Sequence, residues 1–234
     1  MNDTSTPVPQ RRATVAALLA SGGIYFAAEF IAAAAWTDPP YSYTYHYISN
    51  LGVHGPSTGF GQYMYSPLAW VMNTGFILFG IVAFAGVATL RGLPGRRRVP
   101  LTATAALLTV GVILVGLFPG SGEALEDGTA DYHGLGAFAA FISGNVLLIL
   151  LGRAHRLFGI PRGWGRALTG LGIFGFVGLV AFMAAVSTGA NVLVGLCERG
   201  AVYPIMIGLI GLGAALRRAG HRVGSLDPGM PQPS

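Results

Sequence analysis

Residues 13–35 read ATVAALLASGGIYFAAEFIAAAA and contain a single charged side chain, that of Glu29. A helix of this length is about 34 Å long, which is enough to cross the ~30 Å hydrocarbon core of a bilayer. The run also exceeds the ~7–15 apolar residues of a signal-peptide core, so a cleaved signal peptide is the less favoured alternative. This stretch therefore predicts a membrane-spanning helix.

The composition of the whole chain agrees with this prediction. Of 234 residues, 53% are hydrophobic and 10% are charged, and the mean hydropathy is +0.60. Soluble domains carry about 25% charged residues. The net charge of +5 comes from arginines in short runs between apolar segments, a pattern that indicates membrane topology and not nucleic-acid binding. The single cysteine, Cys197, excludes an intrachain disulfide.

Five further apolar stretches predict an all-α, polytopic membrane protein that forms a six-transmembrane-helix bundle. The predicted spans are residues 13–35, 67–90, 100–118, 132–152, 164–187 and 201–216. Ser66 before Pro67, and Asp131 before Tyr132, are predicted to cap two of these helices. Close helix packing in the fifth span is predicted from the glycines at spacing three, which are Gly172, Gly175 and Gly178. Residues 1–12 and 217–234 are polar and contain proline, and they are expected to be disordered tails.

The arginines predict the orientation of the spans. With six spans, every arginine except Arg199 falls in a segment on the same side of the bilayer. Arginine-rich segments favour the cytoplasmic side, so both termini are expected in the cytoplasm of a multi-pass protein of the cell membrane. The acidic residues predicted on the outer side are Asp38, Glu123, Glu126, Asp127, Asp131 and Glu198.

The connection after the first span contains the most distinctive polar stretch, YSYTYHYISNLG at residues 41–52. A belt of aromatic residues at headgroup depth explains some of its tyrosines. It does not explain Ser49 to Gly52, which is interpreted as a helix end with Gly52 as a left-handed cap. Long loops in compact proteins are usually functional or disordered, so this one is predicted to bind a ligand.

Glu29 lies within the first span, about 10 Å below its outer end. An ionisable group at that depth costs several kcal/mol unless it is paired, protonated or hydrated, so a functional role is the first hypothesis. The alternative is a structural hydrogen bond, to a tyrosine or to Asn73, which lies at a similar depth in the second span.

Two histidines and a charged pair complete the candidate site. His133 begins the fourth span and follows four acidic residues, and Glu198–Arg199 precede the sixth span. Glu198 has helix capping as its structural alternative. Arg199 has three possible partners, which are Glu198, Glu29 and an anionic headgroup such as a phosphate. A metal site that joins His46 and His133 to a carboxylate has no supporting ligand spacing.

Three motifs occur in order along the chain: HYISNLG, the LFPG turn with its following acids and His133, and CERGAVYP. Together they resemble the bacterial integral-membrane family catalogued as domain of unknown function 998, over nearly the whole chain. The resemblance implies a six-helix membrane bundle with polar motifs on one face, and it implies no activity. The positions it marks are Ser49, Asn50, Gly52, Phe118, Pro119, His133, Glu198 and Arg199.

The sequence leaves three functions open. The first is an enzyme that acts on a lipid or amphipathic substrate by acid/base chemistry on the outer face. The second is a non-catalytic scaffold or sensor, and the third is a small-molecule or proton-coupled transporter, which the apolar cytoplasmic half disfavours. The candidate catalytic residues are Glu29, His133 and His46, and the candidate substrate-binding residues are Ser49, Asn50, Asn73, Tyr45, Tyr47, Glu198 and Arg199. No metal, cofactor or nucleic-acid partner is predicted, the bilayer and an amphipathic ligand are the expected partners, and the oligomeric state stays open.

Overall fold

The computed structural model describes residues 8–189 and 193–225, with side chains described as far as residue 220. This part of the chain is helical apart from one short hairpin. Its helices are α1 (Arg12–Ala35), α2 (Ala69–Ala88), α3 (Gly95–Leu117), α4 (Gly122–Asp127), α5 (Ala130–Arg153), α6 (Arg162–Ser187) and α7 (Val194–Ser225). The shorter elements are the 3₁₀ helices η1 (Ser49–Gly52) and η2 (His155–Phe158), and the strands β1 (Ser57–Gly59) and β2 (Gln62–Met64).

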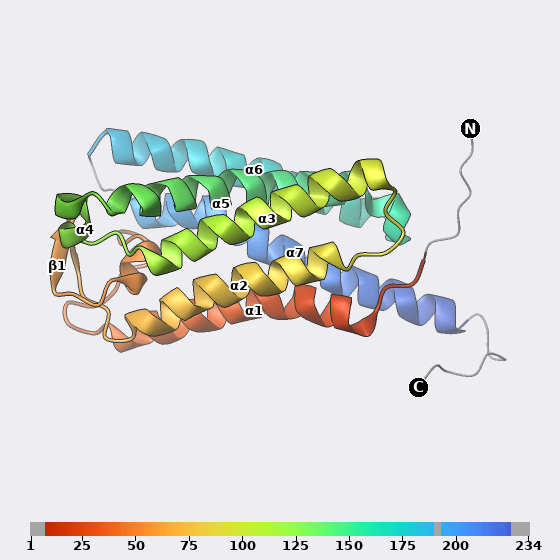
Figure 1. Cartoon of the computed structure of the whole chain (residues 1–234), viewed down its shortest axis with the longest axis horizontal. Helices are drawn as coiled ribbons and strands as arrows, with labels where there is room; N and C mark the ends of the chain where they lie inside the picture. The colour runs from red at the N-terminus through yellow and green to blue at the C-terminus, as the bar shows by residue number, and fades with distance from the viewer. Residues whose placement is uncertain (1–7, 190–192, 226–234) are drawn as a thin grey trace.

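Six of these helices are long and apolar enough to cross a membrane, and they lie side by side (Figure 1). Helices α1, α2, α3, α5, α6 and α7 each contact the next one in this order, and α7 returns to contact α1. Helix α7 also touches α5, so it packs toward the middle of the structure. Fully buried leucines fill the centre, and they include Leu18, Leu147, Leu148, Leu209 and Leu212.

The outward faces of the long helices carry large apolar side chains. On α6, for example, Ile173, Phe174, Val177 and Val180 are each more than half exposed. A soluble protein rarely exposes so wide an apolar surface. These faces fit contact with lipid, which explains why the helices show little division into a polar and an apolar side.

The glycines of α6 form the close-packing face that their spacing predicted. Gly172 lies against the backbone of Asn145 in α5, and Gly178 lies against the backbone of Gly200 in α7. All three glycines of the motif, including Gly175, are buried. A side chain at these positions would push the helices apart, so the prediction is confirmed.

Several helices begin at residues that differ from the starts predicted from the apolar runs. Helix α2 begins at Ala69 with Leu68 as its N-cap, so Ser66 and Pro67 precede the helix. Helix α5 begins at Ala130, which places Asp131 inside the first turn, and its N-cap is Thr129.

Helix α3 begins at Gly95 and carries Pro100 within it. Its first turns contain arginines, so the prediction from apolar residues placed the helix start too late. Charged side chains at the edge of a membrane are solvated, and the backbone there stays helical.

The largest difference concerns the last span. The predicted start was residue 201, but α7 begins at Val194, so Glu198 and Arg199 lie inside the helix and not before it. Both side chains are at most 5% exposed. The two charges interrupt the apolar run of the sequence without ending the helix, because each has a buried partner in the fold.

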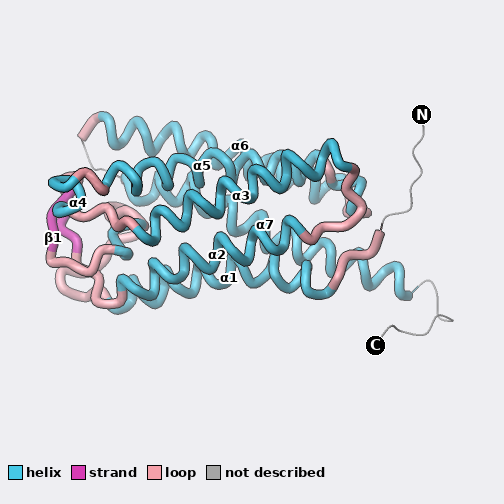
Figure 2. The backbone as a smooth tube through the Cα atoms, in the orientation of Figure 1, coloured by secondary structure: helices cyan, strands magenta, loops and turns pink. Residues whose placement is uncertain are grey.

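The connections divide between the two ends of the structure. The loop between α1 and α2, the loop with α4, the last turn of α6 and the first turn of α7 lie together at one end, here called the loop-rich end (Figure 2). The start of α1, the α2–α3 and α5–α6 connections and the last turns of α7 lie at the other, the arginine-rich end (Figure 1).

The loop-rich end contains a hairpin that the sequence did not predict. Strands β1 and β2 are joined by Phe60 and Gly61, which both have positive φ, as two-residue hairpin turns require. Ser57, Gly59, Gln62 and Met64 form the hairpin's buried face. This face includes Gln62, which forms a hydrogen bond with Asn50 of η1 and so lies among the polar groups of the long loop.

Candidate functional site

Glu29 and Arg199 form an ion pair inside the helices. The Arg199 Nη2–H and Nε–H groups donate to Glu29 Oε1 at 2.9 and 3.1 Å, and the Tyr203 hydroxyl donates to the same oxygen at 2.9 Å. Glu29 has no exposed surface, and Arg199 is 4% exposed. Of the three partners considered for Arg199, Glu29 is the one that the structure shows.

Arg199 also ties the long loop to α7. Its Nη1–H groups donate to the carbonyl oxygens of Tyr43 and His46 at 2.8 and 3.2 Å, and its Nη2 contacts the Tyr41 hydroxyl. The guanidinium lies 4.8 Å from the centre of the Tyr43 ring. Glu29, Tyr41, Arg199 and Tyr203 are called the ion-pair cluster below. Because its donors are already used, the guanidinium has little capacity left for a ligand.

His46 lies at the edge of this cluster. Its ring stacks on Trp36 and Tyr41, and its Nδ1 accepts a hydrogen bond from the Ser42 N–H at 2.9 Å. Nδ1 is therefore unprotonated. Burial lowers the pKa of His46 below its ordinary value, and the nearby positive charge of Arg199 lowers it further. Burial also disfavours the charged form of Tyr41, and it therefore raises the pKa of this tyrosine, although Arg199 opposes the shift.

Of the two structural alternatives considered for Glu29, the hydrogen bond to a tyrosine is present, with Tyr203, and the one to Asn73 is not among the described contacts. The Asn73 Nδ2–H group instead donates to the Gly52 carbonyl at 2.9 Å. Gly52 is not a left-handed cap either, since it is absent from the glycines with positive φ. Its hydrogen atoms face Asn73 Oδ1 so closely that a Cβ would overlap it. Close approach between η1 and α2 is therefore what requires glycine here.

Gln62 organises the other predicted loop residues. Its Oε1 accepts from Asn50 Nδ2 at 2.6 Å and from the Tyr47 N–H at 3.4 Å, and its Nε2 donates to the Tyr45 carbonyl. Asn50 is 2% exposed, while the Tyr45 side chain is 53% exposed. Asn50 thus holds the loop together. Gln62 was missed because its hairpin was not predicted.

A second polar group of side chains, here called the cavity cluster, consists of Ser49, His133 and Glu198. The Glu198 Oε2 accepts a hydrogen bond from the Ile48 N–H at 2.5 Å. His133 Nδ1 lies 2.8 Å from the Phe118 carbonyl, which only accepts, so Nδ1 carries the proton. In the neutral ring the Nε2 atom then has a free lone pair. These residues offer a hydroxyl, a carboxyl oxygen and a proton-accepting nitrogen.

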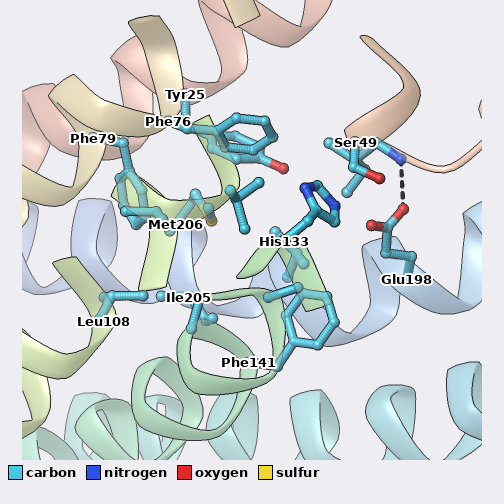
Figure 3. A pocket seen from close by; sticks show the side chains of 16 residues that line it. Tyr25, Ser49, Phe76, Phe79, Leu108, His133, Phe141, Glu198, Ile205 and Met206 are labelled. Atoms are coloured by element: carbon cyan, nitrogen blue, oxygen red, sulfur yellow. Dashed lines mark hydrogen bonds between the residues drawn. The ribbon is translucent and has the colours of Figure 1, made fainter. Parts of the chain in front are cut away.

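The cavity cluster borders a small inner cavity of about 40 Å³. Figure 3 shows Ser49, His133 and Glu198 at one end of it, and apolar side chains such as Phe79 and Leu108 at the other. The Tyr25 hydroxyl is buried, points toward His133 in this view, and has no hydrogen-bond partner among the described residues. The cavity has room for about two or three water molecules, which such polar groups bind.

A second, larger cavity of about 210 Å³ lies on the other side of the same residues. It is called the aromatic groove here. Ser49, His133, Ala137, Phe141 and Glu198 line both spaces. The remaining lining residues are Tyr47, Phe60, Gly134, Phe138, Phe182, Met183 and Val186. The groove is therefore apolar along its length and polar where it meets the inner cavity.

The structure separates the predicted site residues into these two clusters. Glu29 and Arg199 meet, with His46 at their edge, whereas His133 and Glu198 meet at the cavity. Consecutive residues of a helix point about 100° apart, so Glu198 and Arg199 are directed into different spaces. Tyr25 was missed, although its position one helical turn before Glu29 is a signal the sequence contained. The described residues contain no group of three or more His, Cys, Asp or Glu that could hold a metal ion.

Six long apolar helices, lipid-compatible outer faces and a set of buried polar groups between the helices define an integral membrane protein with transmembrane helices. The model of a family described as protein of unknown function, DUF998, matches residues 19–215. The chain belongs to this family, as the resemblance of its motifs suggested. No curated protein and no solved structure matches the chain.

Proposed function

We propose that the six long helices form a six-span bundle in the cell membrane, with both termini in the cytoplasm. The support is the charge distribution. Arg91, the run Arg96–Arg98, Arg153 and Arg156 lie at the arginine-rich end, whereas Glu123, Glu126 and Asp127 lie in the loop that contains α4. Positive residues favour the cytoplasmic side, so the loop-rich end faces outward. The cavity cluster then lies within reach of the outer leaflet.

The protein binds an amphipathic molecule at this end, with the apolar chain in the aromatic groove and the polar head at the cavity cluster. One observation carries this proposal: Ser49, His133 and Glu198 lie where an apolar groove meets an inner cavity. Binding sites for small molecules are mostly apolar with a few convergent polar groups, which is the arrangement found here.

The chemistry proposed for this site is proton transfer to and from the bound molecule. His133 Nε2 is the proton acceptor, because Nδ1 is held by the Phe118 carbonyl, and Glu198 is the second titratable group. Glu29 and His46 are assigned structural roles, since the first is paired with Arg199 and the second is stacked and hydrogen-bonded in the loop.

Binding can be tested with a neutral single-chain amphiphile, 1-dodecylglycerol, titrated calorimetrically into the protein in nanodiscs. Gly134 lines the groove, and a Cβ there meets nothing within 4 Å, so Gly134→Trp fills the groove without a clash at Cβ. Gly170 in α6 is equally open but outside the groove, and Gly170→Trp is the matched control. We expect the first variant to bind about tenfold more weakly or worse and the second to bind like the wild type.

Proton transfer can be tested by incubating the protein with a total membrane-lipid extract and following changes by mass spectrometry. A product that forms with the wild type and is absent with His133→Gln supports the acid/base role. Groove-dependent binding without any conversion would instead identify a non-catalytic sensor or scaffold.

A further inference from the structure

Glu198 is a buried carboxyl group that has no cationic partner within residues 8–189 and 193–220. It is 5% exposed, and the described residues form one salt bridge, which joins Glu29 to Arg199. Its one hydrogen bond is the donation from the Ile48 N–H to Oε2. A buried carboxylate is costly unless a positive group or several donors compensate it. When it is ionised, Glu198 therefore lacks a positive partner among the described residues.

No arginine lines the groove or the inner cavity, and the chain contains no lysine. The basic side chain that lines both spaces is His133, whose neutral ring offers a lone pair at Nε2 and no positive charge. Arg199, which follows Glu198 in the sequence, donates its hydrogen bonds to Glu29, Tyr41 and backbone carbonyls. A phosphate or sulfate headgroup would find no cation here and would be repelled by Glu198. The site thus disfavours the anionic headgroups that the sequence alone suggested for Arg199.

The groove next to Glu198 is built from aromatic rings in mutual contact. Tyr47 packs edge-on against Phe60 and Phe182, with ring centres 6.4 and 5.9 Å apart, and Phe182 packs edge-on against Phe141 at 5.8 Å. Phe60 reaches this position because its backbone adopts positive φ in the hairpin turn. Aromatic faces attract cations, and aromatic cages recognise quaternary ammonium groups.

We infer that the aromatic groove and Glu198 recognise an amphipathic molecule with a positively charged amine or quaternary ammonium headgroup. The ammonium lies between the aromatic rings and the Glu198 carboxylate, which supplies the counter-charge, and the alkyl chain follows the groove. This inference rests on the proposed function, because it specifies the headgroup of the amphipathic molecule proposed above.

The test compares three amphiphiles with the same chain length and different headgroup charge. Dodecyltrimethylammonium, 1-dodecylglycerol and dodecyl sulfate are titrated into the protein in nanodiscs of zwitterionic lipid, and titrations into empty nanodiscs are subtracted. We expect the cation to bind about tenfold more tightly than the neutral compound, and the anion to bind most weakly.

Two variants assign the preference to its source. Glu198→Gln keeps an acceptor for the Ile48 N–H and removes the negative charge, so the preference for the cation over the neutral amphiphile should become smaller. Phe182→Leu keeps the charge and removes one ring, so cation binding should weaken more than neutral binding. The second variant also covers the case in which Glu198→Gln does not fold.

The outcomes separate the two proposals. Equal binding of the cationic and neutral compounds to the wild type overturns the headgroup assignment and leaves the amphipathic site intact. Tighter binding of the anion overturns it as well. If Gly134→Trp weakens the binding of none of the three amphiphiles, the amphipathic site itself is overturned. The headgroup assignment then falls with it.

Discussion

Arg199 Nη2 lies 2.9 Å from Glu29 Oε1, although the two residues are 170 positions apart and both are almost fully buried. The pair joins α1 to α7, the first and last of the long helices. The remaining Arg199 donors reach the carbonyl groups of Tyr43 and His46. One guanidinium therefore fixes the closure of the helices and the conformation of the long loop.

Removing one partner of this pair should destabilise the protein strongly. Arg199→Met leaves the Glu29 carboxylate buried without compensation, a change that costs about 3–5 kcal/mol in comparable buried pairs. The double variant Glu29→Leu, Arg199→Met should be more stable than Arg199→Met alone, because no charge remains buried. Equilibrium unfolding in mild detergent measures both. An Arg199→Met protein as stable as the wild type would contradict the pairing.

Gly52 and Asn73 should show energetic coupling. Gly52→Ala places a methyl group onto Asn73 Oδ1 and should cost about 1–3 kcal/mol of stability. Asn73→Ala removes the obstruction together with the hydrogen bond to the Gly52 carbonyl. The double variant should then lose less stability than the sum of the two single variants. Simple additivity in a double-mutant cycle would show that η1 and α2 do not approach this closely.

Gln62 should matter more than its place in a short hairpin suggests. Gln62→Ala leaves Asn50 Nδ2 without its acceptor, and an unsatisfied buried polar group costs about 1–3 kcal/mol. The neighbouring Tyr63 is 42% exposed and serves as the control. Thermal unfolding should show a clear loss for Gln62→Ala and little change for Tyr63→Ala. Equal losses for the two variants would argue against the buried network.

The stability of the loop-rich end should fall in mild acid because of His46. Its pKa in the folded protein is below the ordinary value of 6.5. The unfolded chain therefore binds the proton more readily, and stability is fully present above about pH 6.5 and lost as the pH falls toward the folded-state pKa. The melting temperature of the wild type, measured between about pH 5 and pH 8, should decrease on the acid side. His46→Gln should flatten that part of the profile, and an unchanged slope would assign it to another group.

The sequence was sufficient for the features that depend on local composition. Apolar runs located the six long helices, and the spacing of Gly172, Gly175 and Gly178 located a close helix contact. The resemblance to the DUF998 family was also confirmed, because the motifs that carry it are short, contiguous stretches of sequence. The prediction from apolar residues was wrong at the start of α7. Glu198 and Arg199 continue the helix there, because the fold provides partners for both side chains.

The arrangement of the site needed the structure. Arg199 had three reasonable partners in the sequence, and the rotation of α7 about its own axis decides among them. The same rotation directs Glu198 toward His133, so that two residues expected in one site belong to two clusters. Gln62 is a polar residue in a segment that shows no functional pattern, and its role comes from packing between elements distant in sequence.

Because Glu198 and Arg199 are consecutive in a continuous helix, their backbone positions move together. A displacement of α7 that shifted the Glu198 carboxylate would also shift the Arg199 guanidinium, which holds the long loop through Tyr43 and His46. The wall of the groove and the conformation of the long loop are therefore linked through one helix. Helix α7, which carries both residues, extends from the loop-rich end to the arginine-rich end (Figure 1).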